Sequence, residues 1–305
     1  PDSLLFVRPI TGANDYTDLF PHLHLRFDQN ENRIYRASVN QTLARPSFRQ
    51  LNPSTDIDPT ANDDDGLVVK GLTELNPVKS TNLELSVAQY FGNNNSVSFG
   101  IFYKDMSDNI YRLTRNVQPS DPSFFPSTAL VREFLNADGA QVLGLEFSFD
   151  YDLVSISEIL KGFNVSGNFT YTDSEVDGIQ REDANGNLFL ENGQTSLFGQ
   201  VPRTYNLSFG YSLNKIDSRI AWNRSSNYLD FGGISADPNL DIYISERDRI
   251  DFSIRYRVKP QWTLFMEMQN VFDDDSRAFE GDEALRMFYR EEAGRSTWLG
   301  VRWSK

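Results

Sequence analysis

The sequence predicts an all-β protein, an antiparallel up-and-down transmembrane β-barrel with about 11–12 strands present. Three observations lead to this fold class. Apolar and polar residues alternate with a period of two along most of the chain, and the connections between the alternating stretches are short and long in turn. Hydrophobic residues make up only 39% of the 305 residues while aromatic residues reach 13%, a composition that suits a thin apolar skin better than a packed soluble core.

Each predicted strand rests on a run of alternate apolar residues. The predicted strands, in order, are 19–28, 32–43, 79–91, 95–104, 129–151 (one long strand), 163–174, 198–212, 217–229, 246–257, 261–272 and 294–303. The apolar residues that mark all of these strands except 217–229 are, in the same order, Leu23 and Leu25, Tyr35 and Val39, Leu83 and Leu85, Phe99 and Ile101, Leu143 and Leu145, Phe163 and Val165, Leu207 and Phe209, Phe252 and Ile254, Leu264 and Met266, and Leu299 and Val301.

The connections follow a rule of their own. Short connections lie at 28–31, 92–95, 214–217 and 259–260, and a moderate one at 152–162. Long ones lie at about 44–78, 105–128, 175–197, 230–246 and 273–293. Loops of that length are uncommon in a compact soluble domain, whereas outer-membrane barrels have tight periplasmic turns and long extracellular loops. Because such barrels usually have an even number of strands, a twelfth is expected from Leu4–Arg8 or from strands before residue 1.

The alternation alone does not say which face of the strands looks outward. The polar face carries charges in mid-strand, among them Glu84, Glu146 and Arg255. In a soluble all-β fold this face would be the exterior, and in a wide membrane barrel it would line a wet lumen. The loop lengths favour the membrane barrel, as do aromatic residues near strand ends, such as Tyr90 and Trp303, which suit interfacial girdles.

Charge and composition exclude several classes of function. The formal net charge is −14, so no basic field would gather nucleic acid, and we expect no nucleic-acid partner. The absence of cysteine excludes disulfides, thiolate metal sites and a cysteine nucleophile. No apolar run approaches the roughly 18–20 residues of a membrane-spanning helix. No secretory leader opens the chain, and since Pro1 is not an initiator we expect a processed or truncated protein.

Several segments resemble the barrel domain of TonB-dependent outer-membrane receptors. They are "ARPSFRQLNP" (44–53), "NPVKSTNLELSVAQYFGNNNSVSFGIFYKDMSDNI" (76–110), "QNVFDDDSRAFEGD" (269–282) and "YREEAGRSTWLGVRW" (289–303). Family members commonly end on an aromatic residue, whereas here Trp303 is followed by Ser304 and Lys305. The matching residues are Asn76, Pro77, Lys79, Ser80, Asn82, Glu84, Leu85, Phe102, Tyr103, Lys104, Asp108, Ile110, Asn270, Val271, Phe272, Asp273, Gly294, Arg295, Leu299, Gly300, Val301 and Arg302.

The resemblance implies a barrel of about 22 strands around an N-terminal plug, of which residues 1–305 form a single partial domain, the C-terminal part of the barrel. It implies a bacterial outer-membrane location, with membrane lipid and, through an N-terminal part outside this sequence, the TonB complex as partners. The implied activity is energised import of a scarce, large solute: a ferric siderophore, cobalamin or a saccharide. No covalent chemistry is involved, so we expect no enzyme and no cofactor. A passive pore or secretion barrel of about 12 strands is the main alternative, followed by an outer-membrane phospholipase and a soluble surface-binding protein.

A small-molecule or chelate ligand would contact the outer loops, where arginine and aromatic side chains could hold a catecholate or a sugar ring. Girdle or loop packing is the alternative role for each of these side chains. The candidate ligand-binding residues are Arg112, Arg115, Phe124, Phe125, Tyr228, Phe231, Arg286, Phe288 and Arg290.

Metal and catalytic sites are not expected. His22 and His24 share one strand face, as two metal ligands would, but polar packing in the lumen explains them as well. The acidic stretch 56–66 could attract Ca²⁺, and a solvated loop is the simpler interpretation. A serine nucleophile needs a general base, and the chain has only 2 histidines, so we expect no Ser–His–acid catalytic site.

Overall fold

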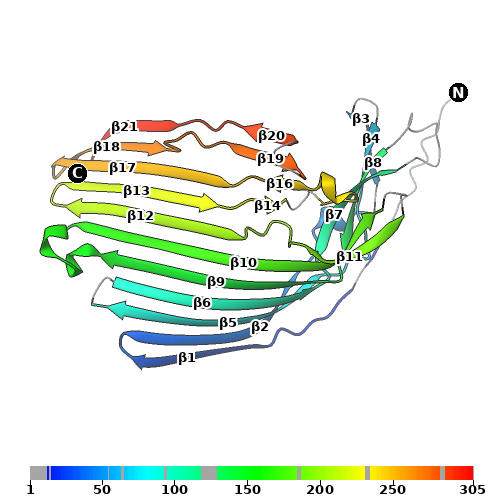
Figure 1. The fold of residues 1–305 in the computed structure, drawn as a ribbon, viewed down its shortest axis with the longest axis horizontal. Coiled ribbons are helices and arrows are strands. Elements are labelled where there is room, and N and C mark those ends of the chain that lie inside the picture. The colour runs from blue at the N-terminus through cyan, green and yellow to red at the C-terminus, as the bar shows by residue number, and fades with distance from the viewer. Residues whose placement is uncertain are drawn as a thin grey trace.

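A curved antiparallel sheet, which we call the wall, dominates the computed structural model (Figure 1). The structure describes residues 12–13, 15–53, 55–62, 65–92, 95–117, 129–183, 187–230, 234–281 and 286–304. Eleven strands follow one another in a single path through the wall, each paired with the strands before and after it. They are β1 (His22–Asn30), β2 (Arg33–Ala44), β5 (Val78–Phe91), β6 (Asn95–Ser107), β9 (Gly139–Asp152), β10 (Phe163–Glu182), β12 (Arg203–Leu213), β13 (Ile216–Ser225), β17 (Arg247–Lys259), β18 (Trp262–Gln269) and β21 (Ser296–Trp303).

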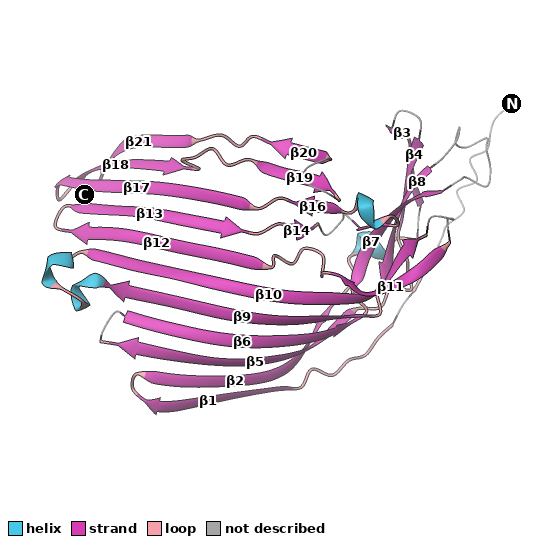
Figure 2. Ribbon diagram, viewed as in Figure 1, coloured by secondary structure: helices cyan, strands magenta, loops and turns pink. Residues whose placement is uncertain are grey.

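The alternation of short and long connections is confirmed. At one end of the wall the strands are joined by tight turns and by two 3-10 helices, η1 (Leu153–Ser155) and η2 (Glu158–Leu160) (Figure 2). At the other end, which we call the loop end, the long connections carry most of the remaining structure. None of the helices in the described part of the chain is long and apolar enough to cross a membrane.

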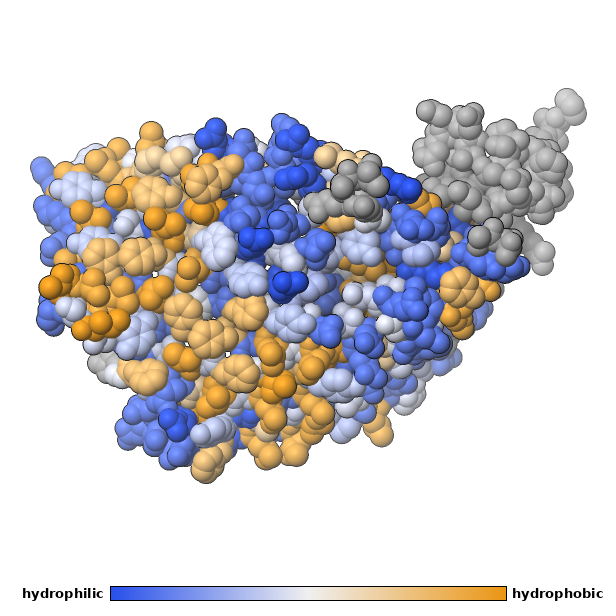
Figure 3. All heavy atoms as spheres, viewed as in Figure 1, coloured by the Kyte–Doolittle hydropathy of each residue, from blue (hydrophilic) through white to orange (hydrophobic). Residues whose placement is uncertain are grey.

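Strand register lines up the apolar residues into one continuous band. Directly opposed residues of an antiparallel pair lie on the same face of the sheet. Leu25 pairs with Ala37, Ala37 with Leu85, Leu85 with Ile101, and Ile101 with Leu145. This row is exposed: Leu85 has 58% of its surface accessible. The apolar residues of these strands therefore share one exposed face, and Figure 3 shows apolar side chains spread over many strands of the visible face. That this face looks outward, toward lipid, stays a prediction.

The opposite face of the wall holds hydrogen-bonded polar pairs. The Ser98 and Ser148 hydroxyls lie 2.6 Å apart across β6 and β9, and Asn206 Nδ2 donates to Asn168 Oδ1 at 2.8 Å. Each wall strand therefore has one wet face and one apolar face, as a barrel with a polar lumen requires.

Two glycines on the polar face make room for aromatic rings. A Cβ at Gly144 or Gly300 would collide with the ring of Phe102 or Phe265, each of which lies directly opposite its glycine on the neighbouring strand. The ring lies over the backbone that the glycine leaves bare, so any larger residue there would displace it.

One predicted strand is wrong. Residues 129–151 do not form a single strand, because the chain breaks at Ala137 and Asp138 between β8 (Ala129–Asn136) and β9. The amide of Ala137 donates to Asn109 O, in the connection between β6 and β7, at 2.7 Å, and that of Asp138 donates to Asp177 O of β10 at 2.9 Å. The segment 129–136 pairs instead with strands of the loop end.

The long connections are more ordered than the sequence predicts. Strand β10 runs on past the predicted end at residue 174 and pairs with β11 (Leu188–Thr195). The loop sheet has the order β15-β7-β8-β4-β3 and the rim sheet the order β14-β16-β19-β20. Their strands are β3 (Thr55–Asn62), β4 (Asp65–Lys70), β7 (Ile110–Val117), β14 (Tyr228–Leu229), β15 (Ile234–Ser235), β16 (Ile242–Ile244), β19 (Ser276–Glu280) and β20 (Met287–Glu291), with the helices α1 (Phe48–Leu51) and η3 (Pro238–Leu240) between them.

The outward band predicts a face-specific response to charge. In bilayers, Leu85→Arg should destabilise the full-length protein by about 2–4 kcal/mol, because the guanidinium would enter hydrocarbon in mid-strand. The matched control is Thr170→Arg, which places the same charge on the polar face, directly opposite Glu146. Equilibrium unfolding in guanidinium from lipid vesicles measures both, and equal losses for the two variants would contradict the assignment of faces.

Candidate functional site

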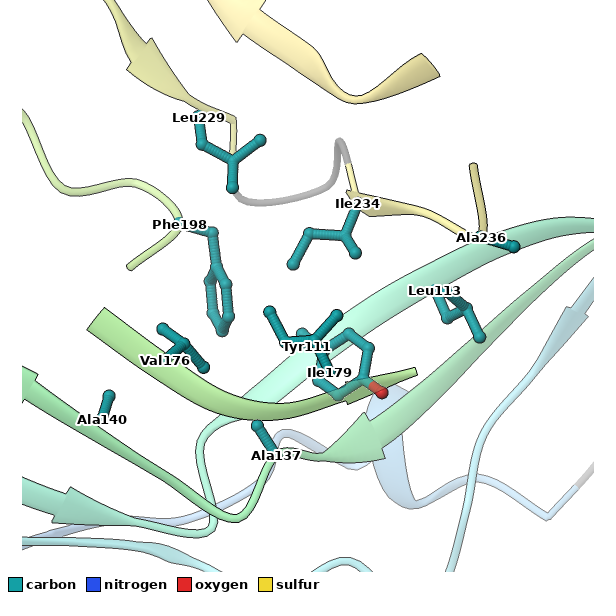
Figure 4. Close-up of a cluster of buried hydrophobic side chains, with 10 residues drawn as sticks. All are labelled: Tyr111, Leu113, Ala137, Ala140, Val176, Ile179, Phe198, Leu229, Ile234 and Ala236. Atoms are coloured by element: carbon teal, nitrogen blue, oxygen red, sulfur yellow. The ribbon is translucent and has the colours of Figure 1, made fainter. Parts of the chain in front are cut away.

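The loop end of the molecule is built around a buried apolar cluster (Figure 4). Tyr111 and Leu113 of β7 pack against Val176 and Ile179 from the end of β10. Further members come from three later segments of the chain: Phe198, Leu229 and Ile234. The cluster therefore ties the ends of several long connections to the wall strands β9 and β10.

Tyr111 shows how tightly this cluster is closed. Its side chain is 1% exposed, and its hydroxyl accepts the amide proton of Gln180 at 2.9 Å. Burial raises the pKa of the Tyr111 phenol, so the group stays neutral and the hydrogen bond persists.

A buried arginine lies beside the cluster. The Arg181 guanidinium binds Asp241 through two parallel hydrogen bonds of 2.8 and 2.9 Å. Its Nε donates to Glu191 at 3.0 Å, and Nη2 to Thr195 Oγ1 at 2.9 Å. The Thr195 hydroxyl in turn donates to Glu191, and Nη1 of Arg181 also reaches the Ser235 carbonyl at 2.6 Å.

This network cross-links three separate segments. Arg181 lies on β10 beyond Tyr171, where pairing with β12 ends, while its partners come from β11 and from the segments around β15 and η3. Burial opposes the charge of Arg181, but the hydrogen bonds to Asp241 and Glu191 outweigh it and hold the arginine pKa above its usual value. The arginine is therefore a charged, fully paired centre of the loop end.

The far side of β7 and β8 faces a second, smaller cluster. Phe134 and Ile110 pack there with Leu75, and Leu51 of α1 lies against them. Arg112 shares this side of the hairpin. Burial lowers the pKa of Arg112, and the charge of Arg132 lowers it further.

The structure separates two candidate residues that the sequence grouped together. Arg112 and Arg115 are an odd number of positions apart on β7, so they project from opposite faces. Arg115 forms an ion pair with Glu133, with Nη2 at 2.8 Å from Oε1. It is thus already engaged with a carboxylate on its own hairpin.

The remaining described candidates gather around the rim sheet. Tyr228 opens β14 and is half-buried, and Arg286 immediately precedes β20. Phe288 on β20 is exposed, and Arg290 binds Asp275 at 2.6 Å and Glu292 at 3.0 Å. These residues belong to a different sheet from Arg112 and Arg115. Phe124, Phe125 and Phe231 lie outside the described residues, and the ligand-binding role of the whole set stays a prediction.

Sequence reasoning missed Arg132, Arg181 and Asp241. Arg132 was placed within a long wall strand, and Arg181 within a loop without structure. The partners of Arg181 are up to 60 residues away along the chain, so no local pattern could have identified them. The alternation of the segment 129–136 was a usable signal for a strand but gave no sign of which sheet it joins.

Metal ligands do not gather in the part of the chain that the structure describes. No group of three or more histidine, cysteine, aspartate or glutamate residues there could hold an ion. The ring centroids of His22 and His24 lie 5.8 Å apart on the exposed edge strand β1.

The Arg181 network predicts a large effect from a single substitution. Arg181→Met should cost about 3–5 kcal/mol of loop-end stability, because two carboxylates would lose their buried cation. The control is Arg224→Met, since Arg224 is 40% exposed in its ion pair with Glu246 and its loss should cost about 0–1 kcal/mol. Hydrogen exchange at Ile179 and Ile234 measures the change, and equal protection in the two variants would contradict the role of the network.

Comparison with known proteins matches this architecture. The family model described as TonB dependent receptor-like, beta-barrel matches residues 3–271. No curated protein matches the chain.

Solved structures share the fold at low identity. A mutant of the ferric enterobactin receptor PfeA from Pseudomonas aeruginosa has a TM-score of 0.60 and 17% identity, over 93% of this chain and 40% of that one. The siderophore receptor PirA from Acinetobacter baumannii gives 0.57 and 16%, over 93% and 40%. The copper transporter OprC gives 0.60 and 14%, over 92% and 38%. The chain thus spans about two fifths of the length of these proteins, and from the family match it belongs to the β-barrel family of TonB-dependent receptors of the outer membrane.

Proposed function

We propose that this chain is the C-terminal part of the barrel of a TonB-dependent importer, with residues 1–305 forming one partial domain. The observation that carries the proposal is the open wall. Among the described residues, edge strand β1 pairs only with β2 and edge strand β21 only with β18. Unpaired backbone groups cost several kcal/mol each in hydrocarbon, so a wall in a membrane needs further strands to close it.

The size of the wall agrees with this interpretation. Eleven strands are half of the about 22 strands of plugged outer-membrane transporters. The alternative, a complete passive pore of about 12 strands, would require the two edges of the wall to meet. The open edges and the coverage of two fifths of the solved receptors favour the longer barrel.

The solute is proposed to be a scarce, large molecule, in first place a ferric siderophore. Two of the similar structures are named as siderophore receptors and a third as a copper transporter. The exposed aromatic side chain of Phe288 on the rim sheet suits a chelate with aromatic rings. Cobalamin and saccharides are the other solute classes. Transport moves the solute without covalent change, so the protein is proposed not to be an enzyme, and energy would come through TonB.

Energised import can be separated from passive passage by genetics. In cells that express the full-length protein, uptake of radiolabelled iron supplied as a ferric siderophore should require TonB, since a plugged barrel opens only when energised. Loss of uptake on deletion of TonB is the expected result, with an unrelated porin substrate as the control for membrane integrity. Uptake of the same size with and without TonB would contradict the proposal.

The partial-barrel proposal makes a separate prediction for the isolated segment. Residues 1–305 refolded in detergent should not give the heat-modifiable band of a closed barrel on gel electrophoresis. The reason is that β1 and β21 each have a paired strand on one side and none on the other. The full-length protein, refolded in parallel, should give that band. A heat-modifiable, closed species from residues 1–305 alone would support the small pore instead.

A further inference from the structure

One connection differs from its neighbours at the end of the wall that has the tight turns, which we call the turn end. The turns between β1 and β2, β12 and β13, and β17 and β18 have two residues each, and none of these residues is aliphatic or aromatic. The connection between β9 and β10 is longer, at residues 153–162, and contains Leu153, Val154, Ile156, Ile159 and Leu160. Turns in water are mostly polar, so a connection rich in aliphatic residues indicates a contact with an apolar surface.

The β9–β10 connection has a defined shape. Its two 3-10 turns, η1 and η2, are both capped at their N-termini: the Asp152 carboxylate accepts the amide proton of Val154 at 3.3 Å, and the Ser157 hydroxyl accepts that of Ile159 at 3.4 Å. Within the turns, Ile156 N donates to Leu153 O at 3.0 Å. The backbone therefore fixes the directions in which the side chains of the connection project.

The start of the connection is tied to the apolar face of the wall. Asn95, at the beginning of β6, is buried, and its Nδ2 donates to Ser155 Oγ at 2.7 Å. Its Oδ1 accepts the amide proton of Asp152, also at 2.7 Å. Asn95 is an even number of positions from Ile101 on the same strand, so both side chains belong to the apolar face. The connection therefore leaves β9 on that side of the wall.

The end of the connection returns to the same face. A Cβ at Gly162 would lie only 3.3 Å from Cε2 of Tyr211, so the chain passes close to this ring. The next residue, Phe163, lies directly opposite Tyr211, and the two ring centroids are 4.6 Å apart. Phe163 shares its face of β10 with Tyr171, which lies directly opposite Leu145 in the apolar row. Both ends of the connection are thus packed on the apolar side.

Two isoleucines project from the connection into the surroundings. Ile156 is 67% exposed and Ile159 is 89% exposed. The neighbouring turns expose Phe91, which lies directly opposite Asn95, and Ile216, which lies directly opposite Leu213. In Figure 3, hydrophobic side chains cover the left end of the molecule, where Figure 2 draws η1 and η2 in cyan, and they adjoin apolar side chains of the neighbouring strands. The apolar face of the wall therefore continues onto the connection.

We propose that the β9–β10 connection is an interfacial anchor that inserts Ile156 and Ile159 into the bilayer leaflet at the turn end, which in barrels of this kind is the periplasmic leaflet. Apolar side chains at a membrane surface reach about 5–10 Å into the boundary between headgroups and acyl chains. The exposed charges of Glu158 and Lys161 would remain among the headgroups. Lipid is favoured over a periplasmic protein because the patch is continuous with the face of the wall that is predicted to contact lipid.

The anchor goes beyond the proposed function and does not depend on import. It rests on the prediction that the apolar face of the wall looks toward lipid, which measurements on β5 test separately. An importer and a passive pore would use the same anchor. Loss of TonB-dependent uptake and loss of the anchor are therefore distinguishable results.

The test is depth-dependent fluorescence quenching on the full-length protein in vesicles of phosphatidylethanolamine and phosphatidylglycerol. Single cysteines, Ile156→Cys and Ile159→Cys, carry the environment-sensitive dye NBD, and any cysteines before residue 1 are replaced by serine. The matched control is Glu31→Cys, an exposed position in the polar turn between β1 and β2. Lipids with a nitroxide on the upper part of the acyl chain should quench the dye at 156 and 159 at least about twofold more than at 31.

Two results would overturn the anchor. One is quenching at 156 and 159 that is no stronger than at 31, which would place the isoleucines in water. The other is blue-shifted emission at 159 without quenching by the nitroxide lipids, which would show that protein rather than lipid covers the side chain. Because Ile159 is 89% exposed, its replacement should leave the barrel folded, and heat-modifiability on gels checks this for each variant. If one labelled variant does not fold, the other provides the same comparison with position 31.

Discussion

In hydrocarbon, every backbone N–H and C=O group must find its partner within the protein, because no water is present to take its place. In the wall these backbone groups pair between neighbouring strands, in a continuous antiparallel ladder from β1 to β21. The constraint also explains the rest of the wall. Side chains then alternate between lipid and lumen, so the row from Leu25 to Leu145 is apolar and exposed while Ser98 and Ser148 meet on the other face.

The loop end obeys the different rules of a protein in water. There the chain can leave the ladder, as it does at Ala137 and Asp138, and it forms a closed core around Tyr111 and Ile179. Arg181 belongs to this environment, since its three-way pairing with Asp241, Glu191 and Thr195 compensates a charge that burial alone would make unfavourable. The outer loops are thereby fixed relative to the wall, which gives a ligand site at this end a defined shape.

The strands of the wall could be predicted from the sequence because the signals for them lie in residues that are neighbours in the chain. A period of two and the length of each connection are properties of neighbouring residues, and they located all eleven strands of the path. The loop end was not predictable in this way, since its pairings join distant segments: β4 pairs in parallel with β8, and β15 with β7. The assignment of 129–151 to one strand failed for this reason. Arg112 and Arg115 were grouped for a different reason: the segment 105–128 was predicted as a loop, and only as part of strand β7 does their odd spacing place them on opposite faces.

The account depends most on the claim that odd-numbered residues of β5 face lipid. Spin labels placed singly at positions 83 to 88 of the full-length protein in bilayers test it directly. Accessibility to oxygen, which concentrates in hydrocarbon, should peak at Leu83, Leu85 and Val87, and accessibility to a polar nickel reagent should peak at the positions between them. A profile without a period of two, or with oxygen maxima at Glu84 and Ser86, would contradict the account.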